Sequence, residues 1–126
     1  MAQHTTEGCS VEWADSLGAV VVDCAAADSD AFRASVASAV DRLADRDAEK
    51  LRVETGGDTP AVVADCEWLC ADPLPRAEAA GLRALALVCD PAAVEDAAAA
   101  LLSEGSDSDR NVFENGDAAR VWLLEQ

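Results

Sequence analysis

The sequence predicts an α/β domain built on a mostly parallel, mixed sheet of four to five strands, with an N-terminal hairpin and about four helices. Short apolar runs alternate with segments of helical periodicity along the chain, and Gly or Pro falls between them. This alternation favours parallel strands joined by crossover helices, in the order β-β-α-β-α-β-α-β-α. The length of 126 residues fits one domain with its own core. We therefore expect a single domain over residues 1–126, with residues 1–7 flexible.

The first two strands are predicted to form a hairpin. A turn at residues 15–18 separates two apolar segments, residues 9–14 and residues 19–26. The second segment contains three consecutive valines, which are typical of a buried strand. A turn that is symmetric about its centre places Cys9 opposite Cys24.

A helix, a strand and a second helix are expected to follow the hairpin. The first helix begins at Ser29 or Asp30, because such side chains suit the positive end of a helix. A short strand covers residues 50–55, with Leu51 and Val53 on one face. The pair Thr59-Pro60 is typical of a helix start. The apolar positions of the first helix recur at helical spacing and are Phe32, Val36, Val40 and Leu43.

The segment EWLCADPLPRAEAAGLRALALV, residues 67–88, is predicted to contain a broken helix followed by a strand. Pro73 and Pro75 interrupt the helix, because proline lacks a backbone N–H and clashes with the preceding turn. The second helical piece is expected to be capped by Asp72 or a nearby residue and to end at Gly81. The nearly continuous apolar run after Gly81 indicates a central strand.

The last third of the chain is expected to add a helix, a strand and a final helix. Asp90-Pro91 begins the first of these helices, and residues 110–113 form a short strand. Asn115 is expected to cap the final helix over residues 117–124. The apolar positions assigned to this helix are Val121, Trp122 and Leu124.

The composition combines an ordinary apolar content with a very acidic charge. The formal net charge is −16, the pI is about 4.1, and 51% of the residues are hydrophobic. Lys50 is the only lysine. An acidic, lysine-poor surface over a normal core indicates adaptation to a high-salt cytoplasm, where ions screen the self-repulsion.

The same charge excludes several classes of partner. Nucleic acids bind clusters of Lys and Arg, which this chain lacks, and anionic membrane surfaces are disfavoured for the same reason. No apolar run approaches the roughly 20 residues of a membrane-spanning helix, so no membrane insertion is expected. The N-terminus lacks the basic and apolar regions of a secretion signal. These observations together predict a cytoplasmic protein.

Two blocks of sequence resemble a family of small STAS-like proteins, which are related to the sulfate-transporter and anti-sigma-factor-antagonist domain. The first block contains residues 65–68 (DCEW), 74–76 (LPR) and 79–83 (AAGLR). The second is the closing segment, residues 113–123 (FENGDAARVWL). The two blocks and the element order cover most of the chain. The resemblance implies a STAS-like fold and a non-enzymatic regulatory or protein-interaction module.

The chain departs from the family at several places, and one of them is the stretch that would carry a phosphorylation switch. Pro73 stands where the family usually has Trp. The serine-containing stretch that is phosphorylated in anti-sigma-factor antagonists is absent, and residues 56–59 fill its place. Thr55 or Thr59 is therefore the candidate phosphoacceptor. For Thr59 the simpler interpretation is an N-cap, whose hydroxyl accepts from the helix backbone.

The five cysteines do not indicate a disulfide framework or a zinc ribbon, because their number is odd and no C-x-x-C occurs. Cys66 and Cys70 are four residues apart and could supply two ligands of a metal site, whereas the simpler interpretation is that Cys66 packs in the core. The only histidine, His4, lies in the terminus expected to be flexible, so no nucleophile has an evident base. We predict neither an enzyme nor a bound cofactor or metal. The cysteines are Cys9, Cys24, Cys66, Cys70 and Cys89.

The candidate interaction surface consists of Glu67, Trp68 and Arg76. Trp68 is predicted to be an interface anchor, or alternatively a packing residue over the edge of the sheet. Arg76 is expected to form a structural ion pair with Glu78 or Asp72 rather than an anion site. The predicted function is thus the binding of an unidentified protein partner. The alternative is a carrier of a small apolar ligand or lipid, because the resemblance extends to lipid-transfer-type relatives whose sheets cradle apolar molecules. The small side chains of the alanine-rich helices could leave a groove for such a ligand, or could simply allow close packing of helices on the sheet.

Overall fold

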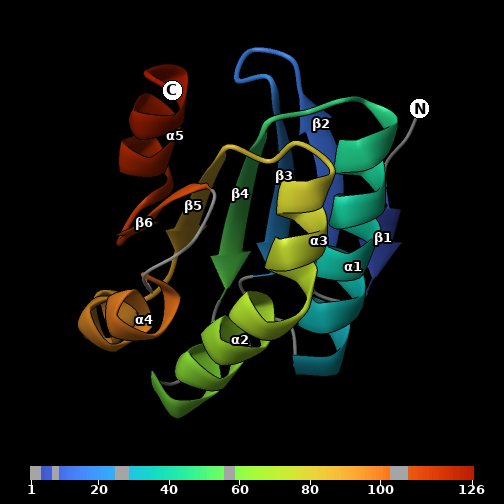
Figure 1. Cartoon of the computed structure of the whole chain (residues 1–126). Helices are drawn as coiled ribbons and strands as arrows, with labels where there is room; N and C mark the ends of the chain where they lie inside the picture. Colours follow the sequence, from blue (N-terminus) through green and yellow to red (C-terminus); the bar gives the residue numbers. More distant parts are fainter. Residues whose placement is uncertain (1–3, 7–8, 25–28, 56–58, 103–107) are drawn as a thin grey trace.

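The computed structural model describes residues 4–6, 9–24, 29–55, 59–102 and 108–126, which form an α/β domain with a mixed, mostly parallel sheet (Figure 1). The sheet has six strands, and their order in space follows their order in the sequence. The three pairs from β3 to β6 are parallel, whereas β1, β2 and β3 pair antiparallel. The strands are β1 (His4–Thr6), β2 (Cys9–Ala14), β3 (Ala19–Cys24), β4 (Lys50–Thr55), β5 (Ala84–Val88) and β6 (Asp109–Phe113).

Strand β1 corrects the expectation that the sheet has at most five strands. His4–Thr6 pairs antiparallel with β2, and Thr6 lies opposite Cys9. A three-residue strand carries no apolar alternation long enough to detect in the sequence. The position of β1 follows from the backbone N–H and C=O groups at the outer edge of β2, which are available for pairing.

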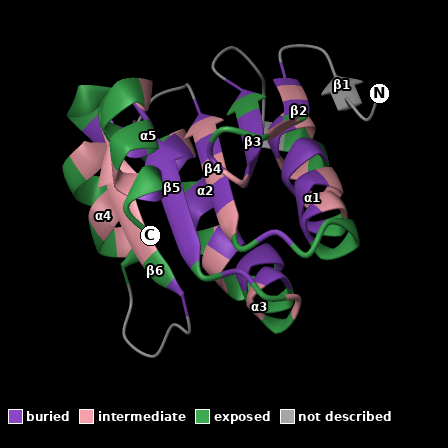
Figure 2. Cartoon of the chain, turned by 90° about the horizontal axis from the view of Figure 1, so that it is seen from above, coloured by how far each residue is buried: buried purple, intermediate pink, exposed green. Residues whose placement is uncertain are grey.

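Helices cover both faces of the sheet. The contacts of α1 are with β2 and β3, those of α4 are with β6 and α2, and α3 packs on α1 and α2. Helix α5 packs on β5, β6 and β4 from the opposite side, and Figure 2 shows α5 and α3 on opposite sides of the strands. No helix in the described part of the chain has both the length and the apolarity to cross a membrane. The helices are α1 (Ser29–Asp45), α2 (Thr59–Ala71), α3 (Pro73–Ala79), α4 (Val94–Leu101), which follows a 3₁₀ turn (Pro91–Ala93), and α5 (Gly116–Leu124).

The larger core lies between the sheet and helices α1 to α4. Alternate residues of each strand point to this side, because side chains alternate along a strand. Leu51 and Val53 are both fully buried there, which confirms the face predicted for β4. A smaller core under α5 is built mainly from alanines of the same strands. The strand residues of the larger core include Val11, Val20, Val22, Leu51, Val53, Leu85 and Leu87.

The break predicted at Pro73 is present, since α2 ends at Ala71 and α3 begins at Pro73. Asp72 occupies the N-cap position of α3, but its side chain makes no capping hydrogen bond and pairs with an arginine of α3 instead. Gly81 ends α3 as expected. Its φ of 115° lets the N–H groups of Gly81 and Leu82 reach back to carbonyls of the last turn, at 3.1 and 2.9 Å.

The C-terminal elements begin as predicted, but the final helix buries other residues than expected. The Asp90 carboxylate accepts from the Ala92 N–H at 2.9 Å, and the Asn115 side chain accepts from the Ala118 N–H at 2.8 Å. In α5 the fully buried residues are Ala119 and Leu123. Val121 and Leu124, which were assigned to its apolar face, are 53% and 48% exposed, and Trp122 is half-buried. The sheet accepts one narrow stripe of α5, and the small Ala119 lets the helix approach closely.

Cys9 and Cys24 lie opposite each other on β2 and β3, as the hairpin predicted, and they form a disulfide. The expectation that the cysteines form no disulfide is therefore wrong for this pair. Both residues are buried in the larger core, on the side covered by α1. The bond was missed because an odd cysteine count says nothing about two thiols that a hairpin register brings together.

Candidate functional site

A half-buried tryptophan on α2 is the centre of the candidate interaction surface. The Trp68 ring packs edge-on against the buried Phe32 ring of α1, with centroids 6.3 Å apart. The remainder of Trp68 is accessible beside two exposed carboxylates, Glu67 and Asp72. We call Arg33, Glu67, Trp68 and Asp72 the Trp68 surface. Trp68 is half-buried, so it packs against the larger core while part of it remains accessible. This placement is compatible with a packing residue and with an interface anchor, the two interpretations made from the sequence.

Arg33 of α1 places a cation on the Trp68 ring. Its guanidinium carbon lies 5.2 Å from the ring centroid, which is within the range of a cation–π contact. The Nε atom of Arg33 is 3.8 Å from a carboxylate oxygen of Asp65, a side chain that is only 5% exposed. The ring of Trp68 is thus a site where a positive group is already accepted from one side.

Arg76 lies at the far end of this region, on α3, and is not part of an anion site. Its Nη2 atom is 3.5 Å from the carboxylate of Asp72, and both side chains are more than half exposed. The Asp72 N–H donates to the Trp68 carbonyl at 3.1 Å, so Trp68, Asp72 and Arg76 succeed one another along the α2–α3 corner. The ion pair predicted for Arg76 is confirmed. An exposed pair of this kind contributes about 0–1 kcal/mol.

The two candidate phosphoacceptors stand at either end of the loop between β4 and α2. Thr55 is the last residue of β4 and is 5% exposed, so its hydroxyl is closed to a modifying enzyme in this conformation. Thr59 is the first residue of α2, but its side chain lies outside the described part of the chain, as do residues 56–58. Phosphorylation therefore stays a prediction, and it concerns Thr59 before Thr55.

Of the three free cysteines, Cys66 and Cys89 are buried and Cys70 is half-buried. Cys66 is 1% exposed, and desolvation by burial, followed by the nearby Cys89, raises the pKa of its thiol to about 12. Burial also raises the pKa of Cys89. No group of three His, Cys, Asp or Glu side chains that could hold a metal ion occurs among the residues described.

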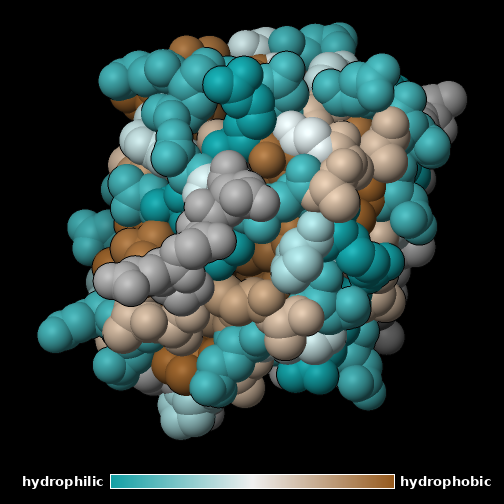
Figure 3. Space-filling view, in the orientation of Figure 1, coloured by the Kyte–Doolittle hydropathy of each residue, from teal (hydrophilic) through white to brown (hydrophobic). Residues whose placement is uncertain are grey.

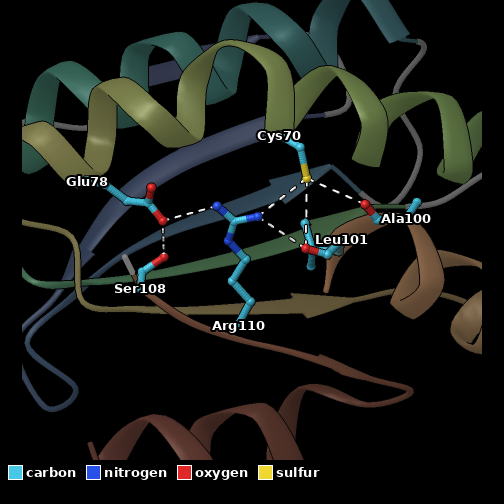
Figure 4. Close-up of polar contacts among 6 residues, drawn as sticks. All are labelled: Cys70, Glu78, Ala100, Leu101, Ser108 and Arg110. Atoms are coloured by element: carbon cyan, nitrogen blue, oxygen red, sulfur yellow. Dashed lines mark hydrogen bonds and ion pairs between the residues drawn. The ribbon is translucent and has the colours of Figure 1, made fainter. Parts of the chain in front are cut away.

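A buried ionic cluster between α2, α3, α4 and β6 was not expected from the sequence (Figure 4). The Nη2 atom of Arg110 donates to the Glu78 carboxylate at 3.0 Å, and the two side chains are 6% and 10% exposed. The Ser108 hydroxyl donates to the same carboxylate oxygen. The other arm of Arg110 donates to the Leu101 carbonyl at 3.1 Å and to the sulfur of Cys70 at 3.5 Å.

The chemistry of this cluster is structural. Burial raises the pKa of Glu78, but hydrogen bonds from Ser108 and Arg110, together with the positive charge of Arg110, outweigh burial and leave the pKa below its usual value. The carboxylate is therefore charged and fully engaged. The sequence contained one signal of this cluster. Arg110 and Val112 are two residues apart in β6, so their side chains point to the same face, which is the face that packs against the larger core.

Comparisons of the chain with protein-family models, with curated proteins and with solved structures gave no match. The family resemblance therefore rests on the sequence blocks quoted above, and function must be argued from the arrangement of side chains. Figure 3 shows the face with α1 to α4, where hydrophilic residues cover most of the surface and more hydrophobic residues gather over α2 and α4.

Proposed function

We propose that this protein is a non-enzymatic regulatory module of STAS type that binds a protein partner through the Trp68 surface. The observation that carries the proposal is a large aromatic ring held half-open, with a cation on its face and exposed carboxylates beside it. Tryptophan is enriched among the residues that dominate binding energy, especially where neighbouring groups exclude water around it.

The charge of the chain defines the chemistry of the partner. A surface of a protein with net charge −16, flanked by Glu67 and Asp72, favours a partner segment that carries Lys or Arg next to an apolar anchor. A partner cation would lie over the Trp68 ring as Arg33 does, or pair with the exposed carboxylates. This complementarity increases the rate of association and disfavours acidic competitors.

The proposal is tested by affinity capture from a native extract in molar KCl, followed by binding assays with the protein that is captured. Trp68→Ala is expected to weaken binding at least tenfold because it removes the anchor. Glu67→Lys reverses an exposed charge without disturbing packing, and it is expected to weaken binding of a basic partner as well. Trp13→Ala is the matched control, since Trp13 is also half-buried and carries Arg46 over its ring at 5.0 Å, but it lies on β2.

Two outcomes would contradict the proposal. If Trp68→Ala and Trp13→Ala bind the captured partner equally well, the Trp68 surface is not the interface. If Glu67→Lys leaves affinity unchanged while Trp68→Ala unfolds the chain, a basic partner at this surface is ruled out. Circular dichroism of each variant at the assay salt separates lost binding from lost folding.

A carrier of a small apolar ligand or lipid is the second proposal, supported by the alanines of α2 and α4 and by the exposed Leu102 at the end of α4. Against it, the cavity described below is lined by charged side chains. Native mass spectrometry in a volatile salt distinguishes the two functions, because a carrier purified from its host retains an apolar adduct and the interaction module does not.

We also propose a salt-rich cytoplasm as the location, on the strength of the acidic, lysine-poor composition. The stability of the fold is then expected to rise steeply between low and molar KCl, as screening removes self-repulsion. An unchanged thermal midpoint over that range would contradict the adaptation. Reducing cytosols oppose disulfides, so the fraction of Cys9–Cys24 that is oxidised in the native protein tests the location independently.

A further inference from the structure

A polar cavity lies at the amino ends of the parallel strands, at the opposite end of β4 from Thr55 and the loop to α2. Its volume is about 190 Å³. In Figure 1 this is the upper end of the sheet, beside the last turn of α5 and the C-terminus. The residues that line it are Glu49, Lys50, Arg83, Ala84, Asp109 and Gln126.

The cavity follows from the sizes of three residues in one row of the sheet. Lys50, Ala84 and Asp109 are direct neighbours across β4, β5 and β6. Aligned residues of adjacent strands point to the same face, so the short Ala84 side chain forms a floor between two longer ones. With strands about 4.8 Å apart, the α-carbons of Lys50 and Asp109 are roughly 10 Å from each other. Gln126, whose side-chain amide donates to the Trp122 carbonyl at 3.0 Å, closes one side.

Lys50 supplies a positive charge that the described residues leave without a partner. It is half-buried, and its ammonium group makes no hydrogen bond or ion pair with any described residue. By contrast, Arg83 at the same cavity pairs with Glu49 at 3.5 Å, and Arg52 on the same strand pairs with Glu54 at 3.3 Å. The only lysine of a chain with 25 acidic residues thus lines this cavity with a charge that no described residue pairs.

The backbone at the floor of the cavity is already satisfied. The N–H groups of Arg83 and Ala84 donate to the Glu49 carbonyl at 2.7 and 3.1 Å, and the Asp109 N–H donates to the Arg83 carbonyl at 2.8 Å. Recognition in this cavity must therefore come from side chains. The two that are not engaged with another described residue are the Lys50 ammonium group and the Asp109 carboxylate, one on each side of Ala84.

We propose that this cavity binds a small zwitterion of the amino-acid type, with its carboxylate at Lys50 and its ammonium group at Asp109. A simple anion would meet the Glu49 and Asp109 carboxylates and the net charge of −16, and a simple cation would meet Lys50 and Arg83. A zwitterion matches both ends. The volume of about 190 Å³ exceeds that of a small amino acid such as alanine or serine, so the cavity has room for either.

The experiment is an NMR titration of the full chain in molar KCl with alanine as the probe, following backbone amide shifts. Saturable shifts are expected at Lys50, Ala84 and Asp109. Lys50→Gln is expected to weaken the binding of alanine at least tenfold, and Asp109→Asn several-fold. Arg120→Gln, which removes an exposed positive charge of α5 away from the cavity lining, is expected to change the affinity less than twofold.

Acetate and methylammonium are the half-ligand controls. Each is expected to bind more weakly than alanine by at least tenfold, because each satisfies one end of the cavity. Acetate that binds as tightly as alanine would overturn the zwitterion and reduce the cavity to an anion site. Shifts that do not saturate, or that persist unchanged in Lys50→Gln and Asp109→Asn, would overturn the proposal altogether.

Discussion

The two faces of the sheet are built from the same strands but with different side chains. Towards α1–α4 the strands present mainly Val and Leu, and their buried residues form one continuous cluster. Towards α5 the central strands present Ala19, Ala84 and Ala86, together with charged residues such as Lys50. Small residues allow α5 to lie close, but next to long charged side chains they leave a hollow. The difference in side-chain size therefore decides where this fold is solid and where it has room for a ligand.

The positive side chains show the same contrast. Arg110 faces the larger core, and its two terminal nitrogens are held by Glu78, by a carbonyl and by a sulfur. Lys50 faces the side of α5 and is held by no described residue. In a chain this acidic, the cation that the fold does not use is the better indication of a binding site.

The largest expected effect comes from breaking the Arg110–Glu78 pair. Arg110→Met leaves a buried carboxylate without its partner, which typically costs 3–5 kcal/mol, so we expect about that loss in the free energy of unfolding. Urea titration at fixed molar KCl measures it. Arg83→Met is the matched control, because its pair with Glu49 is 78% and 57% exposed, and we expect a loss of about 1 kcal/mol or less. Equal losses in the two variants would refute the distinction between the faces.

Removal of the Cys9–Cys24 disulfide is expected to have a somewhat smaller effect on the same core. The bond closes a loop with a sequence separation of 15, for which the loss of stability is about 3 kcal/mol. The double variant Cys9→Ala/Cys24→Ala should match the reduced wild-type protein in its denaturation midpoint. Reductant should not shift the midpoint of the double variant. A wild-type midpoint that reductant leaves unchanged would show that the bond does not support this face.

The smallest expected effect is the pH dependence that Glu78 adds to stability. Its pKa in the fold is below the usual value of 4.5, so the folded state prefers the charged carboxylate. This stabilisation is complete above the unfolded pKa and is lost as the pH falls below about 4.5 through the folded value. This contribution is isolated by comparing the thermal unfolding of wild type and Glu78→Gln from about pH 3 to about pH 7. The two curves should converge at low pH, and curves that remain parallel throughout would contradict it.

Much of the fold was readable because it depends on residues close in sequence. The helix break at Pro73, the stop at Gly81 and the caps at Asp90 and Asn115 follow from local backbone chemistry. The hairpin register also placed Cys9 opposite Cys24. Asp72 occupies the predicted N-cap position of α3, but its carboxylate pairs with Arg76 one turn away instead of making a capping hydrogen bond.

The candidate sites depend on residues far apart in sequence, and there the sequence was a poorer guide. Glu78 and Arg110 are 32 residues apart, and only the tertiary fold brings the carboxylate of α3 within reach of the long arginine side chain of β6. Val121 and Leu124 are residue types that are usually buried, yet the way α5 packs on the sheet leaves both exposed. Periodicity identifies an apolar stripe but does not state how much of it a neighbouring layer will cover.

By itself the sequence determined the α/β class, the parallel core of the sheet, most helix boundaries and the acidic surface, because each follows from local preference or composition. Only the tertiary structure decided which thiols bond, which arginine is buried with a partner, and that Lys50 and Asp109 face each other across Ala84. These pairings are set by strand register and by helix packing, which depend on the whole core at once.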